Sequence, residues 1–305
     1  MSVEGLQNWV VQTGLMVSLL IVIILIIRRP FARAFGANAA YALWSLPLIR
    51  LCFPVISIPE NWIPQALRPA NTPPQEAAIV QPVANLEFPT TLPNVVGEPV
   101  AAVSSGVSFI AVGLMIWASI AVLWLCFQLL QQHQFKARLL AESQMISEEL
   151  AVEAKTLAQR IGLKKTPKIR VSNSNLGPLV TGVTDPIIIV PKTFEADFDT
   201  DQRGFALTHE FAHLKRKDLW VALTALVFRA VNWPNPLVHF AAHRLRADQE
   251  AACDAYVVRL MGGETVHSYA QTLVKAAKQS SGHTPNFGQL AWSLIDEDSK
   301  ISKGD

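Results

Sequence analysis

Two histidines four residues apart, His209 and His213, stand in the segment LTHEFAHLKRKDLW, and Glu210 directly follows the first of them. On a helix, residues i and i+4 lie on one face, so both imidazoles can bind the same metal ion. Glu210 lies about 100° around that helix, where its carboxylate can reach a water molecule at an open position of the metal. The spacing therefore predicts a catalytic zinc site, in which Glu210 removes a proton from the attacking water.

A catalytic zinc ion needs a third protein ligand, and four downstream residues are candidates: Asp218, His239, His243 and Glu250. Asp218 is expected to continue along the first helix and so to point away from the metal. Glu250 is favoured because Asp254 lies one turn later in the helical stretch RADQEAACDAYVVRL. A carboxylate in that place can hold the N–H group of a ligand histidine and fix its orientation.

Ordinary alternatives stay open for each of these residues. The two histidines could share a helix by chance, and Glu250 with Asp254 could form a solvated helix face. A structural zinc site would use four protein ligands, with His243 as the fourth. Candidates for a donor to the oxyanion are Tyr256, His267 and Tyr269, and each could instead be structural.

The composition indicates a membrane protein. Half of the 305 residues are apolar and only 16% are charged, whereas soluble domains carry about a quarter. A net charge of +2, without a basic cluster interleaved with aromatic residues, argues against nucleic-acid binding. The three cysteines form neither a disulfide framework nor a Cys-x-x-Cys metal knuckle.

Three apolar stretches of about the length needed to cross a bilayer are predicted as transmembrane helices. The second is interrupted by two prolines and Arg50, so a buried helix is its alternative. The three predicted spans are Trp9–Ile27, Asn38–Ile58 and Val107–Phe127.

Positive charges predict the orientation of these spans. Arginines follow the first span at positions 28, 29 and 33, and Lys136 and Arg138 follow the third. The proline-rich stretch from Pro59 to Ser105 has the character of an extended loop outside the cell. We therefore expect a multi-pass protein of a bacterial inner membrane, with its N-terminus outside and everything after Phe127 in the cytoplasm.

The predicted cytoplasmic domain is mostly helical with a small sheet. Short β-like runs occur at Ile169–Val171 and Ile187–Val190, and helical patterns precede and follow them. Prolines next to the second run favour a small or edge strand over a central one. The predicted division is residues 1–58 for the first two spans, 59–105 for the outer loop, 106–128 for the third span, 129–280 for the protease domain and 281–305 for a polar tail.

The apolar run Leu219–Phe228 is too short to span a membrane alone. If it did span, Glu250 would lie on the far side from His209. We therefore expect a helix, a turn at Trp233–Pro236 and a returning helix. This pair either packs on the domain or enters the bilayer.

Three segments in this order, HEFAHLKRKD, NWPNPLV and EAACDAYV, resemble the BlaR/MecR-type membrane metallopeptidases, the family of the β-lactam sensor-transducers. The preceding segment GPLVTGVTDPIIIVP is similar to the strand region of that family. The resemblance implies a gluzincin-like α+β domain in the cytoplasm, with Zn²⁺ held by His209, His213 and Glu250 and with Glu210 as the base. No Ser-x-x-Lys acylation motif occurs, so we expect a short family member or a chain whose sensor part is missing.

These observations together predict an integral-membrane zinc endopeptidase that acts in signalling or regulated proteolysis at the cytoplasmic face. Its partners would be a protein or peptide substrate and the lipid bilayer, and it could cleave itself. The substrate backbone is expected to add to the strand at Ile187, Ile188 and Ile189, and the alternative is a strand that only packs the domain. Alternatives are a non-catalytic receptor or scaffold with a structural zinc or none, and a protease for membrane-embedded or lipidated peptides.

Overall fold

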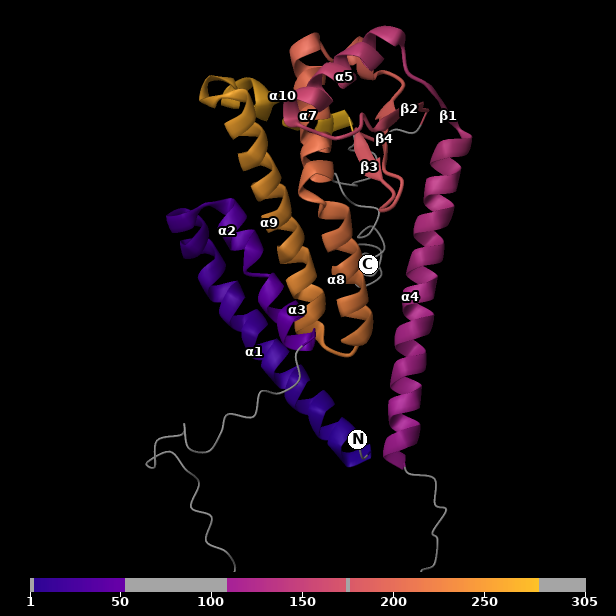
Figure 1. Cartoon of the computed structure of the whole chain (residues 1–305), viewed down its shortest axis with the longest axis vertical. Helices are drawn as coiled ribbons and strands as arrows, with labels where there is room; N and C mark the ends of the chain where they lie inside the picture. The colour runs from indigo at the N-terminus through magenta and orange to yellow at the C-terminus, as the bar shows by residue number, and fades with distance from the viewer. Residues whose placement is uncertain (1–2, 53–108, 174–175, 280–305) are drawn as a thin grey trace, which may run out of the picture.

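The computed structural model describes residues 3–52, 109–173 and 176–279. A head of short helices and a small sheet stands above a bundle of longer helices (Figure 1). The prediction of a mainly helical protein with a small sheet is confirmed. The bundle contains α1 (Val3–Phe35), α4 (Phe109–Ala141), α8 (Asp218–Val231) and α9 (Pro236–Met261).

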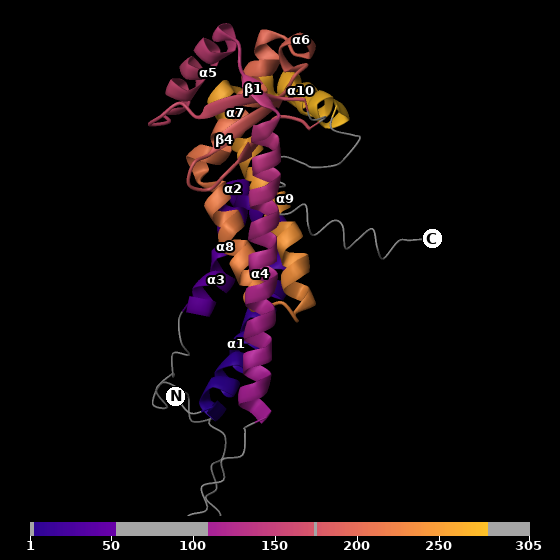
Figure 2. The same ribbon diagram turned by 90° about the vertical axis from the view of Figure 1, so that its right-hand side faces the viewer.

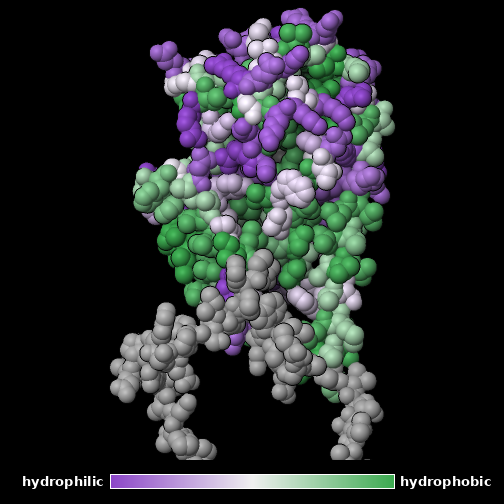
Figure 3. Space-filling model, in the orientation of Figure 1, coloured by the Kyte–Doolittle hydropathy of each residue, from purple (hydrophilic) through white to green (hydrophobic). Residues whose placement is uncertain are grey.

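Two helices of the described chain are long and apolar enough to cross a membrane: α1, over Val11–Phe35, and α4, over its whole length. Their large apolar side chains point mostly outward, as at Leu15 (67% exposed) and Leu123 (69% exposed). The core helix of a soluble protein would bury such residues. Figure 3 shows that the surface of the bundle is mostly hydrophobic, whereas that of the head is mostly hydrophilic.

The sequence predicted three long membrane helices. The prediction of the second one, over residues 38–58, is wrong for the part that the structure describes. That part forms two short helices, α2 (Ala37–Ala42) and α3 (Ser45–Cys52). Between them, Trp44 is buried against α9, and its indole N–H donates to Asp248 Oδ2 at 2.8 Å. Residues 53–58, the predicted outer loop and the predicted polar tail lie outside the described residues.

The sheet has four strands in the order β1-β2-β4-β3, with β4 parallel to β2 and antiparallel to β3. The prediction that Ile187, Ile188 and Ile189 form an edge strand is wrong, because β4 is paired on both sides. The nearby prolines mark the ends of the strand and do not leave one of its sides open. The strands are β1 (Ser143–Met145), β2 (Lys168–Ser172), β3 (Leu179–Thr181) and β4 (Ile187–Pro191).

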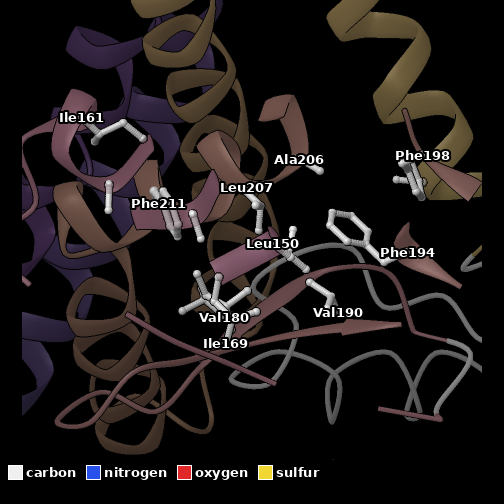
Figure 4. Packing of buried hydrophobic residues seen from close by; sticks show 14 residues of the cluster. Leu150, Ile161, Ile169, Val180, Val190, Phe194, Phe198, Ala206, Leu207 and Phe211 are labelled. Carbon is white, nitrogen blue, oxygen red and sulfur yellow. The ribbon is translucent and has the colours of Figure 1, made fainter. Parts of the chain in front are cut away.

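The core of the head lies between one face of this sheet and two helices, α5 (Glu148–Ile161) and α7 (Thr200–Arg216). Figure 4 shows this packing, including Leu207 and Phe211 of α7. The other sheet face, through Ile187 and Ile189, packs on α4 near Leu139. Helix α4 therefore belongs to the bundle at one end and supports the head at the other, as Figure 2 also shows.

Local signals fix both ends of α7, the helix that carries the two histidines. Asp199 caps its start, where its side chain accepts from the backbone N–H of Gln202 and the Gln202 side chain bonds back in a capping box. The helix ends at Arg216, and the next residue, Lys217, caps it with a left-handed backbone of φ 61°. Such a residue stops a helix and redirects the chain, and α8 begins at Asp218.

The end of α1 is locked to α9 by a mostly buried ion pair. Arg28 bonds to Asp248 Oδ1, and both side chains are less than 15% exposed. Because Trp44 donates to the other carboxylate oxygen, Asp248 holds both α1 and the α2–α3 segment. Asp248 lies two residues before Glu250, so these contacts also fix the helix that presents the predicted third ligand.

Replacing Asp248 with asparagine should destabilise the folded chain by about 3 kcal/mol, because it leaves Arg28 buried without its carboxylate. Thermal unfolding in detergent would measure the effect as a lower midpoint. The matched control is Asp185→Asn, which breaks the exposed pair with Lys168 and should cost less than about 1 kcal/mol. Equal shifts for the two variants would contradict a special role for Asp248.

Candidate metal centre

Helices α7 and α9 bring the three predicted zinc ligands together. The Nε2 atoms of His209 and His213 lie 3.2 Å apart. Glu250 Oε2 lies 3.5 Å from the first Nε2 atom and 3.7 Å from the second. A tetrahedral zinc ion with bonds of about 2.1 Å separates its ligand atoms by about 3.4 Å. The three side chains therefore fit a zinc ion without rearrangement of the helices.

Glu210 is completely buried beside these ligands. Neither of its carboxylate oxygens has a hydrogen-bond partner among the described residues. Burial raises the pKa of Glu210 to about 8, although the neighbouring histidines act in the opposite direction. A buried carboxyl group without a partner is costly, so this one is suited to bind a water molecule or a substrate group.

Asp218 orients His213. Its Oδ2 atom lies 2.8 Å from Nδ1 of the imidazole, and the aspartate is only 3% exposed. Arg216 Nε also donates to this carboxylate, and Tyr41 of α2 donates to its other oxygen. The expectation that Asp218 continues along the histidine helix is wrong, because the left-handed Lys217 turns the chain back toward the site.

Tyr269, on α10 (Val266–Gln279), orients His209. Its hydroxyl oxygen lies 2.7 Å from Nδ1 of the imidazole, and the hydroxyl donates to Asp254 Oδ1 at 2.7 Å. Asp254 itself is 3.3 Å from the same ring nitrogen. The carboxylate therefore acts on His209 mainly through Tyr269. From the sequence, Tyr269 was a candidate only for an oxyanion donor, and no local pattern predicted its contact with His209.

Cys253 is a fourth group near the metal position that the sequence pattern did not single out. Its sulfur and the ring nitrogens of His209 and His213 lie within 4.8 Å of one another, and all three side chains are buried. The thiol also lies 3.5 Å from the backbone carbonyl of His209, to which it donates. Cys253 therefore competes with Glu250 as a candidate ligand.

The structure gives the other candidate residues different surroundings. His239 lies near the start of α9 and donates to the carbonyl of Trp233. His243 is exposed, seven residues before Glu250 and thus about 10 Å away along the helix. Tyr256 packs beside the hydrophobic cores under Arg259, and His267 is exposed and bonded to Gln271.

Asp218→Ala should weaken zinc binding about 10- to 100-fold, because His213 loses the partner that fixes its orientation. Tyr269→Phe should have a smaller effect, since Asp254 remains 3.3 Å from the His209 ring nitrogen and can replace the lost acceptor. Competition titration of zinc against a chelator would compare the two variants with the parent. A larger loss for Tyr269→Phe would reverse the ranking of the two outer partners.

Comparison with known proteins places this site in a family. A family model described as BlaR1 peptidase M56 matches residues 8–301. The regulatory protein BlaR1 of Bacillus licheniformis is 29% identical over 117 residues, which are 38% of this chain and 18% of that protein. The methicillin resistance mecR1 protein of Staphylococcus aureus (strain Mu50 / ATCC 700699) is 24% identical over 123 residues, 40% of this chain and 21% of that protein.

The regulatory protein BlaR1 of Staphylococcus aureus is 22% identical over 163 residues, 53% of this chain and 28% of that protein. The matched segments thus cover well under two thirds of the length of these relatives. The family model, in contrast, covers nearly all of this chain and contains both histidines and Glu250. The resemblance drawn from the three sequence segments is confirmed: the chain belongs to the BlaR1 peptidase M56 family.

Proposed function

We propose that this protein is an integral-membrane zinc endopeptidase that cleaves protein substrates at the cytoplasmic face of the membrane. The observation that carries the proposal is the site itself. Three ligand atoms lie 3.2–3.7 Å apart, beside a buried glutamate whose carboxylate has no partner among the described residues. A structural metal site does not need such a carboxylate, whereas hydrolysis does.

The roles of the residues follow from their positions. His209, His213 and Glu250 would hold the zinc ion, which when bound lowers the pKa of a coordinated water toward about 7. Glu210 would take the proton from the attacking water and deliver it to the leaving amine nitrogen as the C–N bond breaks. Asp218 and the Tyr269–Asp254 pair would keep the Nε2 atoms of the histidines directed at the metal.

Several features support the membrane location and its orientation. The two long apolar helices α1 and α4 have mostly exposed apolar surfaces. Arg28, at the head end of α1, and Lys136, at the head end of α4, are among the positive charges that favour a cytoplasmic head. The curated relatives are named a regulatory protein and a methicillin resistance protein, which supports a role in regulated proteolysis.

A different strand is proposed for substrate binding now that β4 is central. Strand β3 lies at the edge of the sheet, is antiparallel to β4 and contacts α7. An extended peptide could add to this edge through backbone hydrogen bonds, which require no particular side chains. Residues Leu179, Val180 and Thr181 therefore take the substrate-docking role that the sequence pattern assigned to Ile187–Ile189.

Zinc content and peptide cleavage, measured together on the purified chain in detergent, test the proposed function. We expect about one zinc ion per chain, digestion of a mixed peptide library, loss of cleavage with a zinc chelator and recovery after zinc is added back. Self-cleavage would be followed in the same samples. Full zinc occupancy without any cleavage would favour the rival function, a receptor or scaffold with a structural zinc, for which the nearby Cys253 would supply a ligand.

A further inference from the structure

The α8–α9 hairpin has an apolar outer surface. Between Leu219 and Ala242 the only Asp, Glu, Lys or Arg is Arg229, and this side chain is buried. Trp220, Val227 and Phe240 point outward and are 41–50% exposed. Exposed apolar side chains on both helices of the hairpin need an apolar partner.

Contacts with both long helices set the position of the hairpin turn. Asn235, at the turn, donates to the Ser18 hydroxyl of α1 at 2.8 Å. Arg229, near the end of α8, lies over the Trp124 ring of α4 at 5.1 Å. Ser18 and Trp124 belong to the two apolar segments that are long enough to cross a membrane. The turn therefore lies beside the interior of these segments and away from their ends (Figure 1).

The depth of the turn follows from helix geometry. Arg28 is the first charged residue after the apolar run of α1, so it marks the membrane surface, and it is paired with Asp248 of α9. Ser18 lies ten residues earlier, or about 15 Å along α1. The hydrocarbon layer is about 30 Å thick, so Ser18 and the turn bonded to it lie near the middle of the bilayer.

The buried charge in the hairpin is arranged as expected at that depth. Arg229 points inward and donates to Nδ1 of His239, whose Nε2–H donates to the Trp233 carbonyl. The outward-facing Thr224 bonds to the Trp220 carbonyl of its own helix. Polar groups inside membranes face the protein interior or satisfy themselves within the helix.

We infer that the α8–α9 hairpin enters the bilayer from the head side, turns near the midplane and returns, with lipid chains against Trp220, Val227 and Phe240. The inference rests on the proposed membrane crossing by α1 and α4, but it does not depend on catalysis. One consequence concerns the metal site. Glu250 lies two residues beyond Asp248, about 3 Å further along α9, so the zinc position is close to the membrane surface.

Spin labels in lipid vesicles test the position of the hairpin. In a Cys52→Ser, Cys126→Ser background, Val227→Cys or Phe240→Cys would carry a nitroxide, while the buried Cys253 stays in place. Frequent collisions of the nitroxide with oxygen show that the label is in contact with lipid. Frequent collisions with a water-soluble nickel chelate show that the label is in contact with water. The matched controls are Leu123→Cys on α4 and Val152→Cys on α5, both more than 60% exposed.

The hairpin labels should behave like the label at position 123, with loss of nickel collisions relative to position 152. Nickel collisions like those at position 152 would overturn the inference. Protection from both probes would overturn it as well, because protein and not lipid would then cover the hairpin. If the label at position 123 itself collides with the nickel chelate, the proposed membrane crossing by α4 is wrong as well. Peptide cleavage, measured on the same samples, reports separately on the proposed enzyme.

Discussion

Replacing Glu210 with glutamine should reduce peptide cleavage about 100- to 10,000-fold and leave zinc bound. The glutamine side chain has nearly the same shape, so it fits the fully buried position. Its amide cannot accept a proton from the attacking water. The proposed zinc ligands His209, His213 and Glu250 are unchanged, so zinc content should equal that of the parent.

The same substitution should not destabilise the zinc-free fold. Both oxygens of Glu210 lack a hydrogen-bond partner among the described residues, and the side chain is fully buried. Because burial raises the pKa of Glu210 to about 8, its carboxyl group is already mostly neutral at pH 7, and a neutral amide of nearly the same shape should cost no more to bury. Glu149→Gln, at an exposed position of α5, is the matched control and should change neither cleavage nor zinc binding. Cleavage by Glu210→Gln at the parent rate would remove Glu210 from the mechanism.

The features that depend on local residue spacing and on the length of apolar runs could be predicted from the sequence. The two histidines share a helix face because their spacing is close to one turn, and an aspartate caps the start of that helix. The apolar runs in α1 and α4 are long enough to be recognised by length alone. Glu250 was favoured because Asp254 follows it by one turn, and the structure brings both carboxylates to His209.

The predictions that were wrong depend on contacts between distant parts of the chain. Nothing in the local pattern indicates that Lys217 adopts a left-handed backbone, yet this conformation brings Asp218 back to His213. The α2–α3 segment is apolar enough to resemble a membrane helix, but Trp44 finds a partner on α9. Proline at the ends of a strand gave the same signal as proline on an edge strand, and only the pairing of β4 separates the two.

The structure also connects helices α1 and α2 to the candidate metal centre. Tyr41 of α2 donates to Asp218, which holds His213, and Arg216 reaches Asn38 at 2.6 Å. Asp248, which precedes Glu250, is bonded to both α1 and the α2–α3 segment. A shift of α1 relative to α9 would therefore disturb the surroundings of the ligands on both helices of the site.

Replacing Glu250 with alanine should weaken zinc binding by more than the roughly 10- to 100-fold expected for loss of an outer partner. Glu250 Oε2 lies 3.5–3.7 Å from both Nε2 atoms, at the third corner of the ligand set. Without it two neutral imidazoles remain, and no negative ligand offsets the metal charge unless Cys253 supplies one. Peptide cleavage should be lost together with the metal.

Cys253→Ala is the decisive companion variant, three residues away on the same helix. If Glu250 is the third ligand, this variant should keep zinc and cleave peptides, because the thiol is already occupied by the His209 carbonyl. Zinc titration against a chelator would rank the two variants. Cobalt(II) substitution would add an independent readout, since a thiolate ligand gives an intense charge-transfer absorption and a carboxylate does not.

The two outcomes separate the two functions. Zinc loss with Glu250→Ala alone, and no thiolate absorption, leaves three protein ligands and an open fourth position, as hydrolysis requires. Zinc loss with both variants, together with a thiolate band that disappears in Cys253→Ala, means that four protein ligands close the site. A closed site leaves no position for water beside Glu210, and the structural-zinc receptor would then replace the endopeptidase.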